Sequence, residues 1–203
     1  MMSPIQAVVW DLGGVLVRTG DRQPRRAWER QLGLEQDSLD KMVFDSPVSQ
    51  RATVGEASGQ DIWDDLAGRL GLSAEQAADL RRDFWRGDQL DLALIEKIRQ
   101  LRAQYKTGLI TNAWRDIRRS IEDLWHLDDV FDAILISAEV GLAKPDPAIY
   151  RMLLKQWSLP AESVVFIDDF AENIDAARQL GMAAIHFKGP EQAIADLEAL
   201  LDI

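Results

Sequence analysis

Short, largely apolar runs recur along this 203-residue chain, each bounded by glycine or polar residues. The clear runs are Ile5–Trp10, Lys106–Thr111, Ala133–Ile136 and Val164–Ile167, and Met182–Phe187 is a weaker one. A strand that is buried on both faces gives a continuous apolar run, whereas a half-exposed strand alternates apolar and polar positions. The pattern therefore predicts buried strands of a parallel sheet.

Between the later runs, apolar residues recur at helical spacing. The sets are Leu94, Ile98 and Leu101; Ile117, Ile121 and Leu124; Ile149, Leu153 and Trp157; and Ile174, Ala177 and Leu180. Asp146 and Pro147 suit the start of the third helix, and Gly181 suits the end of the fourth. Alternating strands and helices predict an α/β fold with a Rossmann-like, doubly wound parallel sheet.

Residues 19–88 interrupt this rhythm, because they contain no strand-like run. Helical segments are expected at Arg25–Leu32, Leu39–Phe44, Gly59–Leu70 and Ala74–Trp85. We therefore expect an α/β core made of residues 1–18 and 89–203, with a small all-helical domain, 19–88, inserted after the first strand. The charged start of this insert, with Arg22, Arg25 and Arg26, is interpreted as a solvated helix face.

Composition narrows the chemistry. Apolar residues make up 47% of the chain and charged residues 28%, which is typical of a globular protein able to bury a core. There is no cysteine, which excludes disulfides, zinc–thiolate sites and thiol nucleophiles, and only two histidines, His126 and His186, are present. The net charge of −11 disfavours nucleic acid as a partner.

No apolar run approaches the length of a membrane span, and the first residues lack the basic start of a signal peptide. We expect a cytoplasmic protein without a membrane or nucleic-acid partner, and the sequence leaves its oligomeric state open.

Polar residues follow the predicted strands where each strand ends. They are Asp11; Thr111 and Asn112; Lys144, in the loop after the third strand; and Asp168 and Asp169. Ligands bind outside the carboxyl ends of the strands in doubly wound folds. Mg²⁺ would relieve the repulsion among the carboxylates, and a lysine, a hydroxyl and backbone N–H groups suit a phosphate.

Each group also has an ordinary structural interpretation. Asp11 precedes a Gly-Gly turn, Asn112 suits a turn, Lys144 suits a solvated loop, and Asp168 and Asp169 suit a helix N-terminus. The occurrence of all of these groups in order, each at the same end of its strand, favours a functional site.

The segments VVWDLGGVLV, GLITNAW, GLAKPDPAIY and VVFIDDFAENIDAARQLG resemble, in order, the four motifs of the haloacid dehalogenase superfamily. About 100 residues separate Asp11 from Thr111, which leaves room for a helical cap between the first two motifs. The chain looks most similar to the branch that contains the phosphatase domain of soluble epoxide hydrolase and bacterial sugar-phosphate phosphatases.

The resemblance implies a role for each matching residue. Asp11 would be the nucleophile and would bind Mg²⁺ together with the Gly13 carbonyl and Asp169, while Asp168 and Asn173 would hold metal-bound waters. The phosphoryl oxygens would be bound by Thr111 and the backbone N–H of Asn112, and Lys144 would neutralise charge. The implied substrate is a small phosphorylated metabolite, with a sugar phosphate as one candidate.

Gly13 departs from the family pattern, because most of its phosphatases carry there the aspartate that acts as general acid and base. His126 and His186 are weak candidates to replace it, Arg18 and Arg115 are candidate substrate contacts, and Trp114 is a candidate pocket wall. Two alternatives to a phosphatase stay open. One is a non-catalytic binding or regulatory protein, and the other is a 2-haloacid dehalogenase, which would have no use for the paired aspartates.

Overall fold

A five-stranded parallel sheet forms the centre of the protein in a computed structural model that describes residues 4–202. The strand order is β5-β4-β1-β6-β7. The strands are β1 (Ala7–Trp10), β4 (Lys106–Thr111), β5 (Ala133–Ile136), β6 (Val164–Asp168) and β7 (Ala183–His186). All five predicted strands are present, and the predicted fold class is confirmed.

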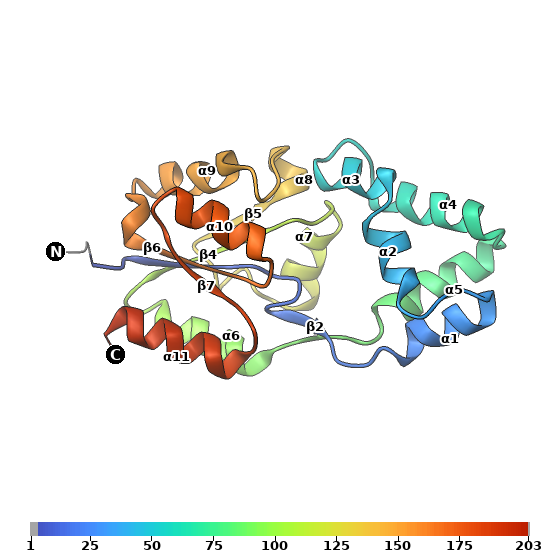
Figure 1. Ribbon diagram of the computed structural model, residues 1–203, viewed down its shortest axis with the longest axis horizontal. Helices are drawn as coiled ribbons and strands as arrows, with labels where there is room; N and C mark the ends of the chain where they lie inside the picture. The colour runs from blue at the N-terminus through green and yellow to red at the C-terminus, as the bar shows by residue number, and fades with distance from the viewer. Residues whose placement is uncertain (1–3, 203) are drawn as a thin grey trace.

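Helices cover both faces of the sheet (Figure 1). One face carries α6 (Leu92–Leu101) and α11 (Pro190–Leu201), and the other carries α9 (Pro147–Trp157) and α10 (Ala171–Gln179). Alternate residues of β1 enter the two resulting cores, with Val8 and Trp10 on the first face. Burial on both faces explains why these strands are apolar throughout.

The sheet reverses its winding at β1, which pairs with β4 on one side and β6 on the other. After β1, the chain forms β4 and β5 on one side of that strand and then crosses over to form β6 and β7 on its other side. Neighbouring connections therefore leave the sheet in opposite directions at the carboxyl end of β1, which is where doubly wound sheets form a ligand crevice.

A separate helical unit lies at the other end of the molecule (Figure 1). It consists of α1 (Gln23–Leu32), α2 (Ser38–Phe44), α3 (Pro47–Thr53), α4 (Gly59–Leu70) and α5 (Ala74–Trp85). These helices share an apolar cluster of their own, which includes Trp28, Leu39, Ile62, Trp63 and Phe84. The sequence pattern missed α3, which is seven residues long and is capped by Ser46.

A two-stranded antiparallel ribbon joins the helical unit to the core. Its strands are β2 (Val17–Thr19) and β3 (Asp88–Leu90), so both crossings of the chain run side by side. The expectation that residues 19–88 contain no strand is therefore wrong at Thr19 and Asp88. Each strand is only three residues long and partly exposed, so it leaves no apolar run to detect.

Arg25 is buried, which corrects its interpretation as part of a solvated helix face. Its guanidinium pairs with Asp40 at 2.9 Å and Asp88 at 2.7 Å, donates to the Phe84 carbonyl at 2.8 Å, and lies over the Phe84 ring. Asp88 belongs to β3, so Arg25 ties the helical unit to the connecting ribbon.

The predicted helix around Ile117, Ile121 and Leu124 is irregular. It starts as α7 (Ile117–Arg119) and continues as a π-helix, η1 (Ser120–Leu124). Hydrogen bonds from i to i+5 turn Leu124 off the buried stripe that regular helical spacing predicts, and 68% of it is exposed. Within residues 4–202, no helix has the length and apolar character needed to cross a bilayer.

Candidate active site

Three carboxylates meet at the carboxyl end of β1 and β6. Asp11 follows β1 directly, Asp168 is the last residue of β6, and Asp169 follows it. Each offers a carboxylate oxygen within 4.8 Å of the others. Thr111, the last residue of the adjacent strand β4, is buried at the same edge. The structure thus brings together the residues that the sequence placed at the strand ends.

Lys144 supplies the opposing charge. Its Nζ lies 2.6 Å from Asp11 Oδ1 and 2.7 Å from Asp168 Oδ2, and only 1% of its side chain is exposed. The Asn112 side chain holds the lysine backbone, because Lys144 N–H donates to Asn112 Oδ1 at 2.8 Å and Asn112 Nδ2 donates to the Lys144 carbonyl at 2.7 Å. Asn112 therefore fixes the loop from which Lys144 reaches the carboxylates.

Asp168 is fully buried and is surrounded by donors. Its Oδ1 accepts from Phe170 N–H at 2.8 Å, and Asn173 Nδ2 lies within 3.1 Å of both carboxylate oxygens. Lys144 completes this set at Oδ2. The structure thus shows Asp168 holding Lys144, whereas a role in binding metal-bound waters stays a prediction. Asn173 Oδ1 is buried without a hydrogen-bond partner.

Asp169 differs from Asp168, because its Oδ1 is buried without any hydrogen-bond partner. Its backbone is held by His186, whose Nε2 donates to the Asp169 carbonyl at 3.0 Å. Gly14, with a φ of +80°, leaves space for the Asp169 carboxylate: a Cβ on Gly14 would lie 2.1 Å from Asp169 Oδ2. A side chain at position 14 would therefore displace the Asp169 carboxylate from its observed position.

Burial and a neighbouring negative charge raise the pKa of two of the carboxylates, Asp11 and Asp169. Burial raises the pKa of Asp11 to about 7, with a further contribution from the charge of Asp168, although Lys144 opposes both. Burial and Asp168 also raise the pKa of Asp169. Burial acts against the charged form of Lys144, but Asp11 and Asp168 together outweigh it and raise its pKa above the usual range. Lys144 therefore stays charged, and Asp11 takes up a proton as the pH falls through about 7.

This donor set fits Mg²⁺. With all three carboxylates ionised, three negative charges and one ammonium leave a net charge of −2, which a divalent cation balances. Mg²⁺ prefers carboxylate and carbonyl oxygens, and the unpartnered Oδ1 of Asp169 is such an oxygen. Asp11, Asp169 and the carbonyl of Gly13 are the groups that would hold it.

No carboxylate stands at position 13, but there is room for one. Gly13 is exposed, and a Cβ added there would meet nothing within 4 Å. A side chain would therefore fit at position 13, and the acid or base is absent because the residue there is glycine.

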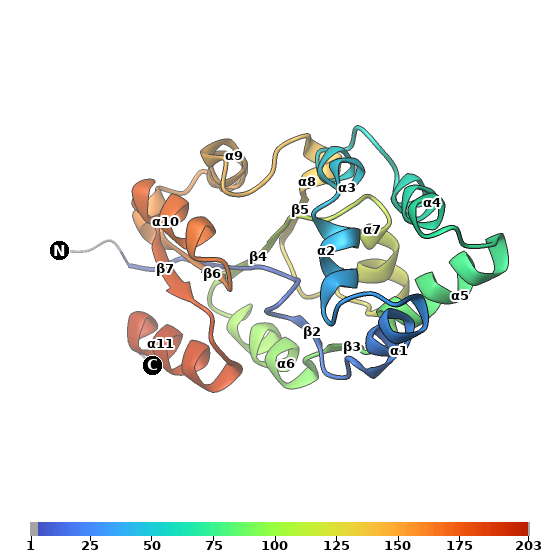
Figure 2. The ribbon, with the colours of Figure 1, turned by 45° about the vertical axis from the view of Figure 1, so that its right-hand side comes forward.

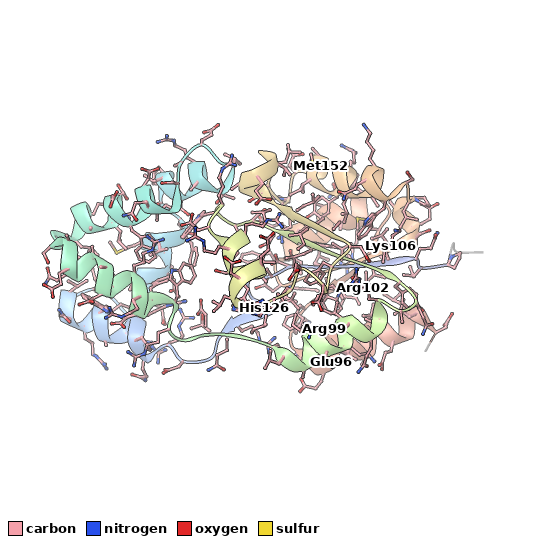
Figure 3. The ribbon with its side chains drawn as sticks, turned by 180° about the vertical axis from the view of Figure 1, so that it is seen from behind. Glu96, Arg99, Arg102, Lys106, His126 and Met152 are labelled. Carbon is pink, nitrogen blue, oxygen red and sulfur yellow. The ribbon has the colours of Figure 1, made fainter. Side chains whose placement is uncertain are left out.

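The remaining candidates from the sequence are His126, Arg18, Arg115 and Trp114, and each lies against other residues. His126 lies near Arg99, and its Nδ1 contacts the Glu122 carbonyl (Figure 3). Arg18 pairs with Asp91 at 2.5 Å. Arg115 Nη2 lies against Gly55, where a Cβ would come within 2.9 Å of it. Trp114 packs against the helical unit, with its ring 5.9 Å from Phe44 and 6.0 Å from Trp85.

The sequence did not predict three features that support the site. They are the space at Gly14, the two side-chain hydrogen bonds of Asn112, and the hydrogen bond from His186 to the Asp169 carbonyl. The Gly-Gly pair after Asp11 was a visible signal, because glycine is the residue that allows close approach of another group. Neither side-chain contact leaves a mark in a single sequence, since both join segments far apart along the chain.

Known proteins resemble this chain in sequence and in fold. A family model described as haloacid dehalogenase-like hydrolase matches residues 5–181. The sesquiterpene phosphatase astK of Aspergillus oryzae is 25% identical over 99% of both chains. The D-ribitol-5-phosphate phosphatase of Bacteroides thetaiotaomicron is 25% identical, covering 87% of this chain and 89% of its own.

The bifunctional epoxide hydrolase 2 of Rattus norvegicus is 35% identical over 46% of this chain, and the match spans 18% of that longer protein. Among solved structures, a magnesium complex of a haloacid dehalogenase family enzyme from Bacteroides thetaiotaomicron superposes with a TM-score of 0.79. That likeness covers 96% of this chain and 99% of the other at 20% identity, and it shows the shared fold.

Exchanging one or the other glycine of the pair for alanine should affect metal binding differently. Gly14→Ala should weaken Mg²⁺ binding at least about tenfold, because its Cβ would displace the Asp169 carboxylate. Its left-handed backbone adds a cost of about 1–2 kcal/mol. Gly13→Ala is the matched control and should retain Mg²⁺ binding, since its Cβ meets no atom within 4 Å.

The measurement is isothermal titration of each folded variant with MgCl₂, with thermal unfolding as the check on folding. Equal Mg²⁺ affinity in Gly14→Ala and Gly13→Ala would show that the Asp169 carboxylate does not hold the metal where the structure places it.

Proposed function

The chain belongs to the haloacid dehalogenase-like hydrolases, and on that basis we propose that it is a Mg²⁺-dependent phosphatase. Its substrate would be a small phosphorylated metabolite, with a sugar phosphate as one candidate, and the reaction would pass through an aspartyl-phosphate on Asp11. The observation that carries this proposal is the pairing of Asp11 with Lys144 beside a carboxylate, Asp169, that has an unpartnered oxygen.

In the first half-reaction, a carboxylate oxygen of Asp11 attacks phosphorus and the bond from phosphorus to the ester oxygen breaks. The leaving alkoxide takes up a proton and the phosphoryl group stays on Asp11. Lys144 is held at 2.6 Å from this carboxylate, so its ammonium offsets the charge of the incoming phosphate. Thr111 and the Asn112 N–H would bind phosphoryl oxygens at the end of β4.

In the second half-reaction, water attacks phosphorus, the bond from phosphorus to Asp11 breaks, and the carboxylate returns as phosphate leaves. When bound, Mg²⁺ would supply electrostatic stabilisation of the negative charge that develops on the phosphoryl oxygens. Asp168 keeps Lys144 in place through both steps, because the ammonium remains 2.7 Å from its Oδ2.

We also propose that residues 19–88 act as a cap over this site. The ribbon of β2 and β3 carries both chain crossings, and it is the place where such a unit could pivot. A closing cap would keep bulk water from the phosphoryl group until hydrolysis is due.

The two alternative functions are weaker. A 2-haloacid dehalogenase would not need the Asp169 carboxylate that Gly14 accommodates. A non-catalytic binding protein would explain Gly13, but it would not need a nucleophile paired with a buried lysine. The names of the relatives, a sesquiterpene phosphatase and a ribitol-phosphate phosphatase, both support phosphate-ester hydrolysis and differ on the substrate.

Release of phosphate from p-nitrophenyl phosphate tests the proposal. We expect release that needs Mg²⁺ and falls by at least about 10⁴-fold in Asp11→Asn, because the nucleophile is lost. Asp169→Ala should also abolish it. Asp175→Asn is the control, since this exposed aspartate on α10 lies outside the site. Mg²⁺-independent release, or undiminished release in Asp11→Asn, would contradict the proposal.

Gly13 generates a second prediction. Without a base for the attacking water, hydrolysis of the aspartyl-phosphate should limit turnover of a substrate with a good leaving group, and p-nitrophenolate should appear in a burst. Gly13→Asp should raise turnover about 10–10³-fold, below the roughly 10²–10⁴-fold that general acid–base catalysis provides. There is space for its Cβ.

Stopped-flow release of p-nitrophenolate at saturating Mg²⁺ makes this measurement. Steady turnover without a burst in the wild type, together with slower turnover in Gly13→Asp, would mean that another group already moves the proton.

A further inference from the structure

Three aromatic rings from separate segments meet between the core and the helical unit. Phe44 ends α2, Trp85 ends α5, and Trp114 lies in the loop after β4. The centroid distances are 5.9 Å for Phe44–Trp85, 5.9 Å for Phe44–Trp114 and 6.0 Å for Trp85–Trp114. We call these three residues the aromatic wall.

The wall remains open to solvent. Phe44 is 44% exposed and Trp85 is 38% exposed, which puts both among the few large apolar side chains that residues 4–202 expose. The others, such as Leu92 and Leu124, belong to other elements, whereas these two rings touch each other. Large aromatic side chains dominate the energetics of binding when a ligand covers them.

Chain connectivity keeps the wall near the proposed phosphoryl site. Trp114 follows Thr111 by three residues, so their Cα atoms are at most about 11 Å apart. Both views place α2, which carries Phe44, on the side of the helical unit that faces the sheet (Figures 1 and 2). A phosphate ester bound at Thr111 would therefore extend its alcohol portion toward these rings.

The charged side chain of Arg81, at this boundary, is already engaged with polar groups. Arg81 donates to Gln60 at 2.8 Å and pairs with Asp116 across the boundary at 3.3 Å. The Arg115 guanidinium lies near Gly55, since a Cβ on that glycine would come within 2.9 Å of its Nη2. A polyol chain would need several free donors and acceptors to replace its hydration, and three adjacent aromatic rings provide apolar area instead.

We propose that the aromatic wall binds the alcohol portion of the substrate, and that the substrate class is therefore a phosphomonoester of an apolar alcohol rather than of a polyol. This inference rests on the phosphatase activity proposed above, and it replaces a sugar phosphate with an alkyl or aryl phosphate. Phe44, Trp85 and Trp114 are specificity-determining residues, whereas Asp11 and Lys144 act on the phosphoryl group whatever the alcohol is.

A series of ethyl, propyl, hexyl and octyl phosphate tests the substrate class, because these leaving groups have similar basicity and differ in apolar area. We expect kcat/KM to rise by up to about fourfold for each methylene group that the wall covers. Propyl phosphate should also exceed glycerol 1-phosphate, which has the same three carbons and two added hydroxyl groups.

Trp85→Ser and Phe44→Ser should reduce the ratio of kcat/KM for octyl phosphate to that for ethyl phosphate by about tenfold or more. Leu124→Ser is the matched control, because it removes an exposed apolar side chain on η1, outside the wall. It should leave the ratio unchanged.

Binding of the same series to Asp11→Asn, measured by titration calorimetry with Mg²⁺ present, separates this inference from the proposed function. A Kd for Asp11→Asn that falls with chain length, together with a wild type that hydrolyses none of these esters, supports the wall and contradicts the phosphatase proposal. Turnover that favours glycerol 1-phosphate, with no chain-length dependence in Kd, supports the phosphatase and overturns the wall. If no ester binds and none is hydrolysed, both proposals fail.

Discussion

The candidate site depends on a balance of charge at one edge of the sheet. Asp11, Asp168 and Asp169 would repel one another in a buried position, and Lys144 neutralises only one of them. Burial first, and then the charge of Asp168, raise the pKa of Asp11, so that a proton becomes the alternative to a second cation. In the proposed phosphatase, a divalent metal ion would restore neutrality and would leave Asp11 ionised and able to attack phosphorus.

Backbone geometry, as well as the charged groups themselves, makes this cluster of charges possible. Parallel strands bring residues distant in sequence to one edge, and the reversal of winding at β1 opens a crevice there. Gly14 makes space for the Asp169 carboxylate, while Asn112 holds the backbone of Lys144. None of the five helices α1–α5 of the helical unit contributes one of the three carboxylates or Lys144.

The sequence predicts the parts that depend on burial. The apolar runs predict the strands within about two residues, because both faces of the sheet are covered, and the strand ends then identify Asp11, Thr111, Lys144, Asp168 and Asp169. The sequence does not predict features that depend on contacts between distant segments. The three-residue strands of the ribbon leave no pattern, and a buried arginine at the start of the insert looks the same as a solvated one.

The central claim is that Asp11 is the nucleophile of this charge-balanced site. The most direct measurement is rapid acid quenching after mixing with p-nitrophenyl phosphate and Mg²⁺, followed by peptide mapping by mass spectrometry. We expect an acid-stable phosphoryl group on the peptide that contains Asp11, lost in EDTA and absent from Asp11→Asn. Release of p-nitrophenolate with no phosphoryl group on Asp11, or with one on another residue, would contradict it.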